Sequence, residues 1–208
     1  MTSRLIFAVV LASCYLGCAS RYQESPGSTI ISPGLEFAIP PGHQLGYSVD
    51  ANQLIIAHFR DKVEVFQAYV SVSPEKVIFV AFDPSGARVM TINSNDDGIY
   101  SEAAPIVPSV LHPENILADI AIVYWPATAV RRGLAGSGAS FFDNGSQRTI
   151  EFGGRRVVQV DYGGPHDNVW PKVAHLHNIE YGYQLDLQST VTADEAQSER
   201  SGHSQSAR

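Results

Sequence analysis

The chain has 208 residues, of which 44% are apolar, and its formal charge at neutral pH is −7. This length is enough for one domain of ordinary size with its own hydrophobic core. The acidic balance, with basic residues scattered along the chain, argues against nucleic acid as a partner. Both cysteines, Cys14 and Cys18, lie near the N-terminus. No disulfide framework can therefore support the domain, and its stability must come from packing.

The N-terminal segment has the pattern of an export signal. Arg4 supplies a positive charge, and residues 5–13 form an apolar run that is shorter than the roughly 20 residues of a membrane-spanning helix. Cys14 and Cys18 follow this run, each after small residues, as in the processing site of a bacterial lipoprotein. Either cysteine can carry the lipid; the signal length slightly favours Cys18. An ordinary secretory signal with incidental cysteines is the alternative.

These features predict a signal peptide over residues 1–17 and a fatty-acyl (palmitate-type) anchor that holds the mature protein in the cell envelope. Ala19 and Ser20, which follow Cys18, provide no acidic signal for retention in the inner membrane. We therefore expect the outer membrane, with the domain facing the periplasm.

The regions that flank the domain have little to bury. Residues 18–34, rich in Ser, Pro and Gly, are expected to form a flexible tether. Residues 192–208 contain no large apolar side chain and are expected to be a disordered tail. The folded part is thus predicted to be a single domain over residues 35–191.

Short apolar runs separated by turn residues dominate this domain. Asp83-Pro84-Ser85-Gly86, Asn144-Gly145 and Gly153-Gly154 are typical turn sequences. The runs rich in Val, Ile, Phe and Tyr between such turns predict antiparallel strands, namely residues 53–59, 63–72, 76–82, 99–102, 147–152, 155–162, 173–179 and 183–189.

Residues 113–125 break the strand pattern, because their apolar side chains recur at helical spacing. Pro113 can begin that helix and Pro126 interrupts it. The helix is apolar on most sides, so it should be buried; a second short helix over residues 127–134 should end at Gly136 or Gly138. The predicted fold class is α+β and mostly β: a curved antiparallel sheet with short helices on its concave face.

Several motifs support a family resemblance. Ile116-Leu117-Ala118-Asp119-Ile120, Val123-Tyr124-Trp125-Pro126, Leu134-Ala135-Gly136-Ser137-Gly138 and Tyr181-Gly182-Tyr183-Gln184-Leu185 resemble a family of bacterial lipoproteins whose genes often lie beside fatty-acid-synthase-like clusters that make aryl polyenes. That family is similar in fold to the lipoprotein-localisation factors LolA and LolB. The resemblance implies a half-barrel with an apolar cavity for acyl chains. The chain departs from the family at Tyr15, within the signal, and at Ala139, where an aromatic residue is expected.

Two constellations that suggest other chemistry have simpler interpretations. Ser137 lacks the glycine spacing and the preceding strand of a nucleophile elbow, so a helix-ending turn is expected there. His175 and His177 alternate on one strand, and with His166 they could bind a metal, but exposed histidines without a metal are the simpler interpretation. We expect no catalytic residues, no metal and no cofactor.

The candidate cavity residues are apolar or aromatic, with one carboxylate among them. Asp119 on the buried helix is either a structural hydrogen-bond acceptor or a polar anchor for a ligand head group. Trp125 should face the concave side of the sheet, whereas Trp170 lies in a polar stretch and should report little on the cavity. The expected lining consists of Trp125, Tyr124, Asp119, Ile116, Ile120, Phe66 and Phe79.

The sequence therefore favours a non-catalytic envelope protein that binds or shields an acyl or polyene-like chain, or the acyl chain of a lipoprotein, in this cavity. The alternative is a structural or assembly lipoprotein with a fully packed core, whose surface binds a protein partner. An envelope hydrolase has no credible set of catalytic residues in this sequence.

Overall fold

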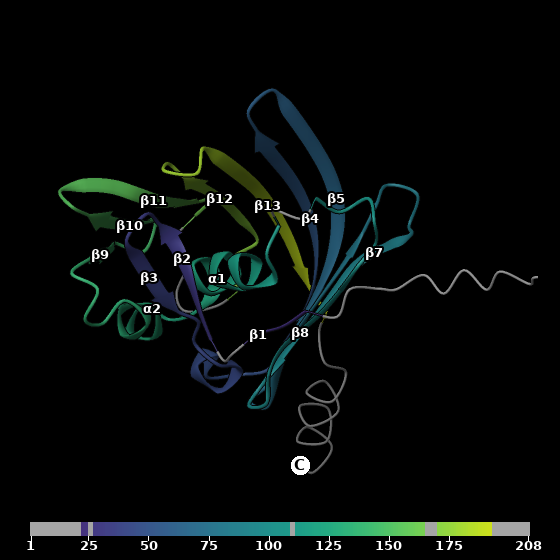
Figure 1. Cartoon of the computed structure of the whole chain (residues 1–208), viewed down its shortest axis with the longest axis horizontal. Helices are drawn as coiled ribbons and strands as arrows, with labels where there is room; N and C mark the ends of the chain where they lie inside the picture. The colour runs from purple at the N-terminus through teal and green to yellow at the C-terminus, as the bar shows by residue number, and fades with distance from the viewer. Residues whose placement is uncertain (1–21, 25–26, 109–110, 165–169, 193–208) are drawn as a thin grey trace, which may run out of the picture.

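A computed structural model of the chain describes residues 22–24, 27–108, 111–164 and 170–192. The predicted signal peptide, Cys14, Cys18 and the predicted tail beyond Thr192 lie outside the described residues. The folded part is built mainly on one large antiparallel sheet, which curves around two helices (Figure 1).

The large sheet contains eleven strands within the described residues, in the spatial order β1-β8-β7-β6-β5-β4-β13-β12-β11-β10-β9. Every neighbouring pair is antiparallel. The strands are β1 (Tyr22–Glu24), β4 (Val49–Phe59), β5 (Lys62–Val72), β6 (Lys76–Phe82), β7 (Arg88–Asn95), β8 (Gly98–Ala103), β9 (Ser140–Asp143), β10 (Gln147–Phe152), β11 (Arg155–Tyr162), β12 (Val173–Asn178) and β13 (Tyr183–Val191).

This architecture confirms the predicted fold class. The sheet is open, with β1 and β9 as its two edges among the described strands, and each predicted strand is present within a few residues. Strands β7 and β9 were not predicted from the sequence. In β7 the inward-facing Met90 and Ile92 alternate with the polar Thr91 and Asn93, a pattern that could have identified the strand.

Helices α1 (Pro113–Tyr124) and α2 (Ala127–Gly133) lie on the concave face, as predicted. Pro113 occupies the first turn of α1, where its missing N–H costs no helical hydrogen bond. Pro126 follows the C-cap residue Trp125 and cannot donate to the preceding turn, so α1 ends there and α2 begins. Gly136 and Gly138, both with positive φ, follow the end of α2.

A hairpin from the predicted tether covers α1 on the side away from the large sheet (Figure 1). Its strands are β2 (Ser28–Ser32) and β3 (Leu35–Ala38), joined by a turn in which Gly34 has a φ of +81°. Ile31, Leu35 and Phe37 are buried. The tether prediction is therefore wrong over this part of the chain, because Ile31 before the Pro33-Gly34 turn and the alternating Leu35 and Phe37 after it give the hairpin a face to bury.

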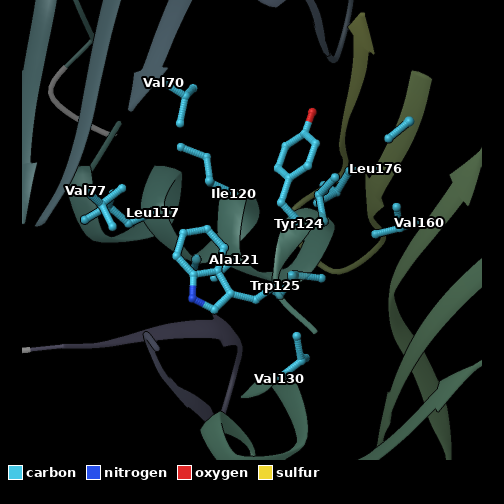
Figure 2. Packing of buried hydrophobic residues seen from close by; sticks show 14 of the residues in the cluster. Val70, Val77, Leu117, Ile120, Ala121, Tyr124, Trp125, Val130, Val160 and Leu176 are labelled. Atoms are coloured by element: carbon cyan, nitrogen blue, oxygen red, sulfur yellow. The ribbon is translucent and has the colours of Figure 1, made fainter. Parts of the chain in front are cut away.

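The core lies between the sheet, the two helices and this hairpin. Leu117 lies beside the sheet residue Val77, Ile120 points toward Val70, and Trp125 belongs to the same core (Figure 2). The covering hairpin explains why α1 is apolar on nearly all sides: it is enclosed by β-structure on two faces. Gly42, in the short 3-10 helix η1 (Gly42–Leu45), passes so close to the backbone of Ser73 that a side chain there would collide with its carbonyl.

A buried arginine of the sheet forms hydrogen bonds to the C-terminal turn of α1. Arg148 of β10 donates from Nη1 to the carbonyls of Ile122 (2.7 Å) and Val123 (3.1 Å), and its Nε pairs with Asp143 Oδ2 at 2.8 Å. The Tyr162 hydroxyl donates to the Val123 carbonyl at 2.6 Å. Because α1 has no basic residue in its own last turn, these groups of the sheet supply the positive charge and the donors that a helix C-terminus requires.

Candidate functional site

Burial decreases along the inner face of the β4–β5 hairpin toward its tip. The inward-facing residues of β4 are buried from Val49 to Ile55, but Ala57 is half-buried and Phe59 is 43% exposed. Figure 1 shows the reason: the hairpin extends past α1, so the helix covers only one end of the concave face. The other end remains open.

Apolar side chains from three neighbouring strands share this open end. Ala57 lies opposite Leu185, Phe59 opposite Tyr183, and Phe66 opposite the buried Ile55. Side chains paired in this way are about 5 Å apart at their Cβ atoms, so they form one continuous surface. We refer to this surface as the open end of the concave face. Its apolar residues are Ala57, Phe59, Phe66, Tyr183 and Leu185, and Glu64 and Lys62 of β5 lie on the same face, opposite Ala57 and Phe59.

Asp119 of α1 borders the open end, where it accepts a hydrogen bond from the hydroxyl of Tyr183. The hydroxyl of Tyr183 donates to the Asp119 carboxyl, with Oδ1 at 2.9 Å and Oδ2 at 2.8 Å. Burial raises the pKa of Asp119 to about 7, although the hydrogen bond from Tyr183 opposes this increase. Burial, together with the charge of Asp119, also raises the pKa of the Tyr183 hydroxyl. A carboxylate can accept about four hydrogen bonds, so Asp119 has capacity for further donors.

The structure divides the predicted cavity residues into two groups. Ile116, Asp119 and Phe66 are half-buried; Phe66 belongs to the open end, and Asp119 borders it through Tyr183. The other four predicted residues lie in the packed core, with exposed fractions of 1% for Trp125, 5% for Tyr124, 7% for Ile120 and 3% for Phe79.

The covered end of the concave face is filled by side chains. The Tyr124 hydroxyl meets Gln53 Nε2 at 2.8 Å and Ser189 Oγ at 2.9 Å, and Gln53 Nε2 also donates to Ser189 at 3.0 Å. The Trp125 indole N–H donates to the Pro41 carbonyl at 3.1 Å. These contacts anchor α1 to the sheet, so a ligand that occupies the concave face in this conformation has to use the open end.

The expectation that Trp170 lies in a polar, uninformative position is wrong. Its ring stacks on Tyr124 with a centroid distance of 3.8 Å and an interplanar angle of 5°, and the residue is only 3% exposed. The polar residues around it in the sequence concealed this placement, because a single aromatic residue can reach the core from a polar connection. Trp170 is therefore part of the packed core beside Tyr124.

The remaining candidate residues have structural partners. The Ser137 hydroxyl donates to the Leu134 carbonyl and accepts the amide of Ala139, as expected for a helix-ending turn. On the outer face of the sheet, His175 and His58 contact the two oxygens of Asp186 at 2.7 Å and 3.0 Å. These contacts lower the pKa of Asp186, with that from His175 the larger cause. The third proposed metal ligand, His166, lies outside the described residues.

Sequence analysis missed the sheet residues that complete the open end. Tyr183 is 64 positions from Asp119, and no local pattern connects them. Leu185 and Ala57 belong to predicted strands, so alternation predicts that they share a face. It does not predict that α1 leaves them uncovered.

Elsewhere, a shallow pocket lies at one end of β7 and β8, where Arg88, Thr91 and Ala104 are among the lining residues.

The described part of the chain contains no helix that is both long and apolar enough to cross a membrane.

The sequence model of a family described as "protein of unknown function (DUF3261)" matches residues 50–191, which include nearly all of the large sheet and both helices. The chain belongs to the DUF3261 family.

Two solved structures illustrate what the DUF3261 chain is similar to. The LolA superfamily protein NE2245 from Nitrosomonas europaea is 12% identical, with a TM-score of 0.42 over 71% of this chain and 86% of that one. A DUF1329 family protein from Desulfovibrio piger is 10% identical, with a TM-score of 0.44 over 74% of this chain and 89% of that one. No curated protein sequence matches the chain.

Proposed function

We propose that this protein is a non-catalytic, lipid-anchored protein of the cell envelope that binds or shields an acyl or polyene-like chain at the open end of its concave face. The observation that carries the proposal is the uncovered apolar surface at that end. Phe59 is 43% exposed there, and Phe66, Tyr183 and Leu185 are only half-buried. They face inward from β4, β5 and β13, beside α1.

The energetics of such a surface suit an apolar ligand. Burial of one methylene contributes about 0.8 kcal/mol, so a groove that shields ten carbons would give useful affinity without any catalytic group. Asp119 lies at the border of the same surface, where its carboxyl can accept hydrogen bonds from a ligand head group. The site thus combines an apolar surface with polar groups at its border, namely Asp119 and the exposed Glu64 and Lys62, which lie opposite Ala57 and Phe59 on the same face.

The envelope location rests on the sequence of the N-terminal segment. A lipid on Cys18, or on Cys14, would hold the domain at a membrane, and the outer membrane is the proposed location. Labelling with a fatty-acid analogue should survive Cys14→Ser and disappear in Cys18→Ser. The opposite pattern would move the anchor to Cys14, and labelling of neither position would remove it.

A titration with a fluorescent polyene fatty acid tests the binding site. Phe66→Glu should abolish the fluorescence increase, because it places a charge on the apolar surface. Val65→Glu is the matched control: it is the neighbouring residue on β5, is 43% exposed and points to the opposite face of the sheet. Ala57→Trp provides a second site variant, which fills the surface without introducing charge.

Binding that is unchanged by Phe66→Glu and by Ala57→Trp would exclude the open end as the site. Equal loss of binding in Val65→Glu would show that the effect is not specific to the inner face. Thermal unfolding of each variant shows whether it remains folded at the assay temperature.

The packed covered end favours one alternative, a structural or assembly lipoprotein that binds a protein partner through its surface. Trp125 is 1% exposed, and Tyr124 is enclosed by Gln53, Ser189 and Trp170. Under this alternative the open end would be covered by a partner, and no lipid would compete for it. Retention of a polyene fatty acid by the purified protein alone distinguishes the two functions.

A further inference from the structure

The pairing of β1 with β8 limits where a lipid anchor can lie. Tyr22 is opposite Ser101 and Glu24 is opposite Ile99, so Tyr22 is the residue of β1 nearest to Ala103, where β8 ends. Cys18 precedes Tyr22 by four positions, and even a fully extended chain spans at most about 14 Å over that interval. A lipid on Cys18 is therefore held close to the C-terminal end of β8.

An unusually apolar turn follows that same end of β8. The Val107 amide donates to the Ala104 carbonyl at 2.9 Å, which closes a turn with Pro105 and Ile106 at its tip. Pro is favoured at the second position of such a turn, but the third usually holds a small or polar residue. Here that position holds Ile106, whose exposed fraction of 78% is the highest of the large apolar side chains in the described part of the chain.

The tip of this turn lies in an uncharged stretch of the chain. Residues 103–113 contain no Asp, Glu, Lys or Arg, so nothing in this segment opposes entry of the tip into the interface. The exposed Arg88 lines the same shallow pocket as Ala104, and the Ala104 amide donates to the Val89 carbonyl at 2.8 Å. The exposed Glu102 lines that pocket too, so one cation and one anion lie at the base of the turn, and the tip itself is uncharged. Apolar side chains at the headgroup boundary with basic residues next to them are typical of membrane-surface contacts.

We infer that the turn Ala104–Val107 is a membrane-contacting surface, with Ile106 inserted at the headgroup boundary and Arg88 next to the lipid phosphates. The inference rests on the lipid anchor of the proposed function. A short connection and an apolar tip on one side of the domain would hold the β1–β8 edge against the bilayer, whereas a long tether would let the domain rotate freely.

Thiol labelling in the lipidated, full-length protein tests this orientation. Ile106→Cys and Phe142→Cys are made separately, and the proteins are reconstituted in vesicles of phosphatidylethanolamine and phosphatidylglycerol. A water-soluble maleimide is then added. Phe142 is a matched control: it is apolar and 55% exposed, and it lies on β9 at the opposite edge of the sheet. Unsubstituted protein gives the background, and forms secreted without a lipidation site give the labelling rates in water.

The thiol introduced at position 106 should react severalfold more slowly in vesicles than in the lipid-free form, because the headgroup boundary shields it from the water-soluble reagent. The thiol at position 142 should react equally fast in both. Equal rates at position 106 in a protein whose intact mass includes the lipid would overturn the inference and leave the anchor standing. An intact mass without lipid would remove the anchor, and the inference with it.

Discussion

Replacement of Asp119 by Asn tests the physical description of the polar anchor at the open end. In the folded protein, burial raises the pKa of Asp119 from 3.8 to about 7. The fold therefore favours the neutral acid, and the Asn side chain imitates that form. The Tyr183 hydroxyl can donate to the amide oxygen of Asn as it does to the carboxyl.

The sign of the pH dependence follows from the raised pKa. Below pH 3.8 Asp119 is protonated in both the folded and the unfolded chain, so its favourable contribution is fully present. Between pH 3.8 and about 7 the unfolded chain ionises first, and this contribution is lost as pH rises. A difference of about three pKa units corresponds to about 4 kcal/mol, and solvent near the half-buried carboxyl reduces this to about 2 to 4 kcal/mol.

Urea unfolding of the wild type and of Asp119→Asn at a series of pH values between 4 and 8 measures this quantity. The free energy of unfolding of the wild type, minus that of the variant, should fall by about 2 to 4 kcal/mol across the series. The subtraction removes the contributions of carboxylates with lowered pKa values, such as Asp186 and Asp50. A difference that does not change with pH, or that increases, would refute the assigned environment of Asp119.

Three further substitutions test the packing that supports the site, each by denaturant unfolding. Arg148→Met removes the buried pair with Asp143 and the donors to two helix carbonyls, and should cost about 3 to 5 kcal/mol. Trp125→Ala should cost about 3 to 5 kcal/mol as a core truncation, and a loss below about 1 kcal/mol would show that the helix is loosely packed. Gly42→Ala should cost about 1 to 3 kcal/mol, because a Cβ atom there would lie 2.0 Å from the Ser73 carbonyl oxygen.

The large sheet could be predicted from the sequence because its strands alternate and its turns have typical residues. Helix α1 could also be predicted from the sequence, since Pro113 and Pro126 lie on either side of an apolar run at helical spacing. The β2–β3 hairpin was concealed by its composition. Ser, Pro and Gly around Ile31 and Leu35 resemble a tether until α1 provides a surface for these residues to cover.

The candidate site was only partly predictable, because exposure depends on which elements cover which. Phe66 and Phe79 are similar aromatic residues on neighbouring strands of the meander, yet Phe79 is buried at 3% and Phe66 remains half-buried. What separates them is the position of α1 across the sheet. The partnership of Asp119 with Tyr183 likewise depends on the distant pairing of β13 with β4, which alternation within a single strand does not specify.

The most direct test of the central claim is native mass spectrometry of the protein purified without detergent from its own host. The wild type should retain an acyl or polyene species beyond the mass of its covalent anchor, Phe66→Glu should lose that species, and Val65→Glu should keep it. A wild-type spectrum that contains only the anchored polypeptide, identical to that of Phe66→Glu, would contradict acyl-chain binding at the open end of the concave face.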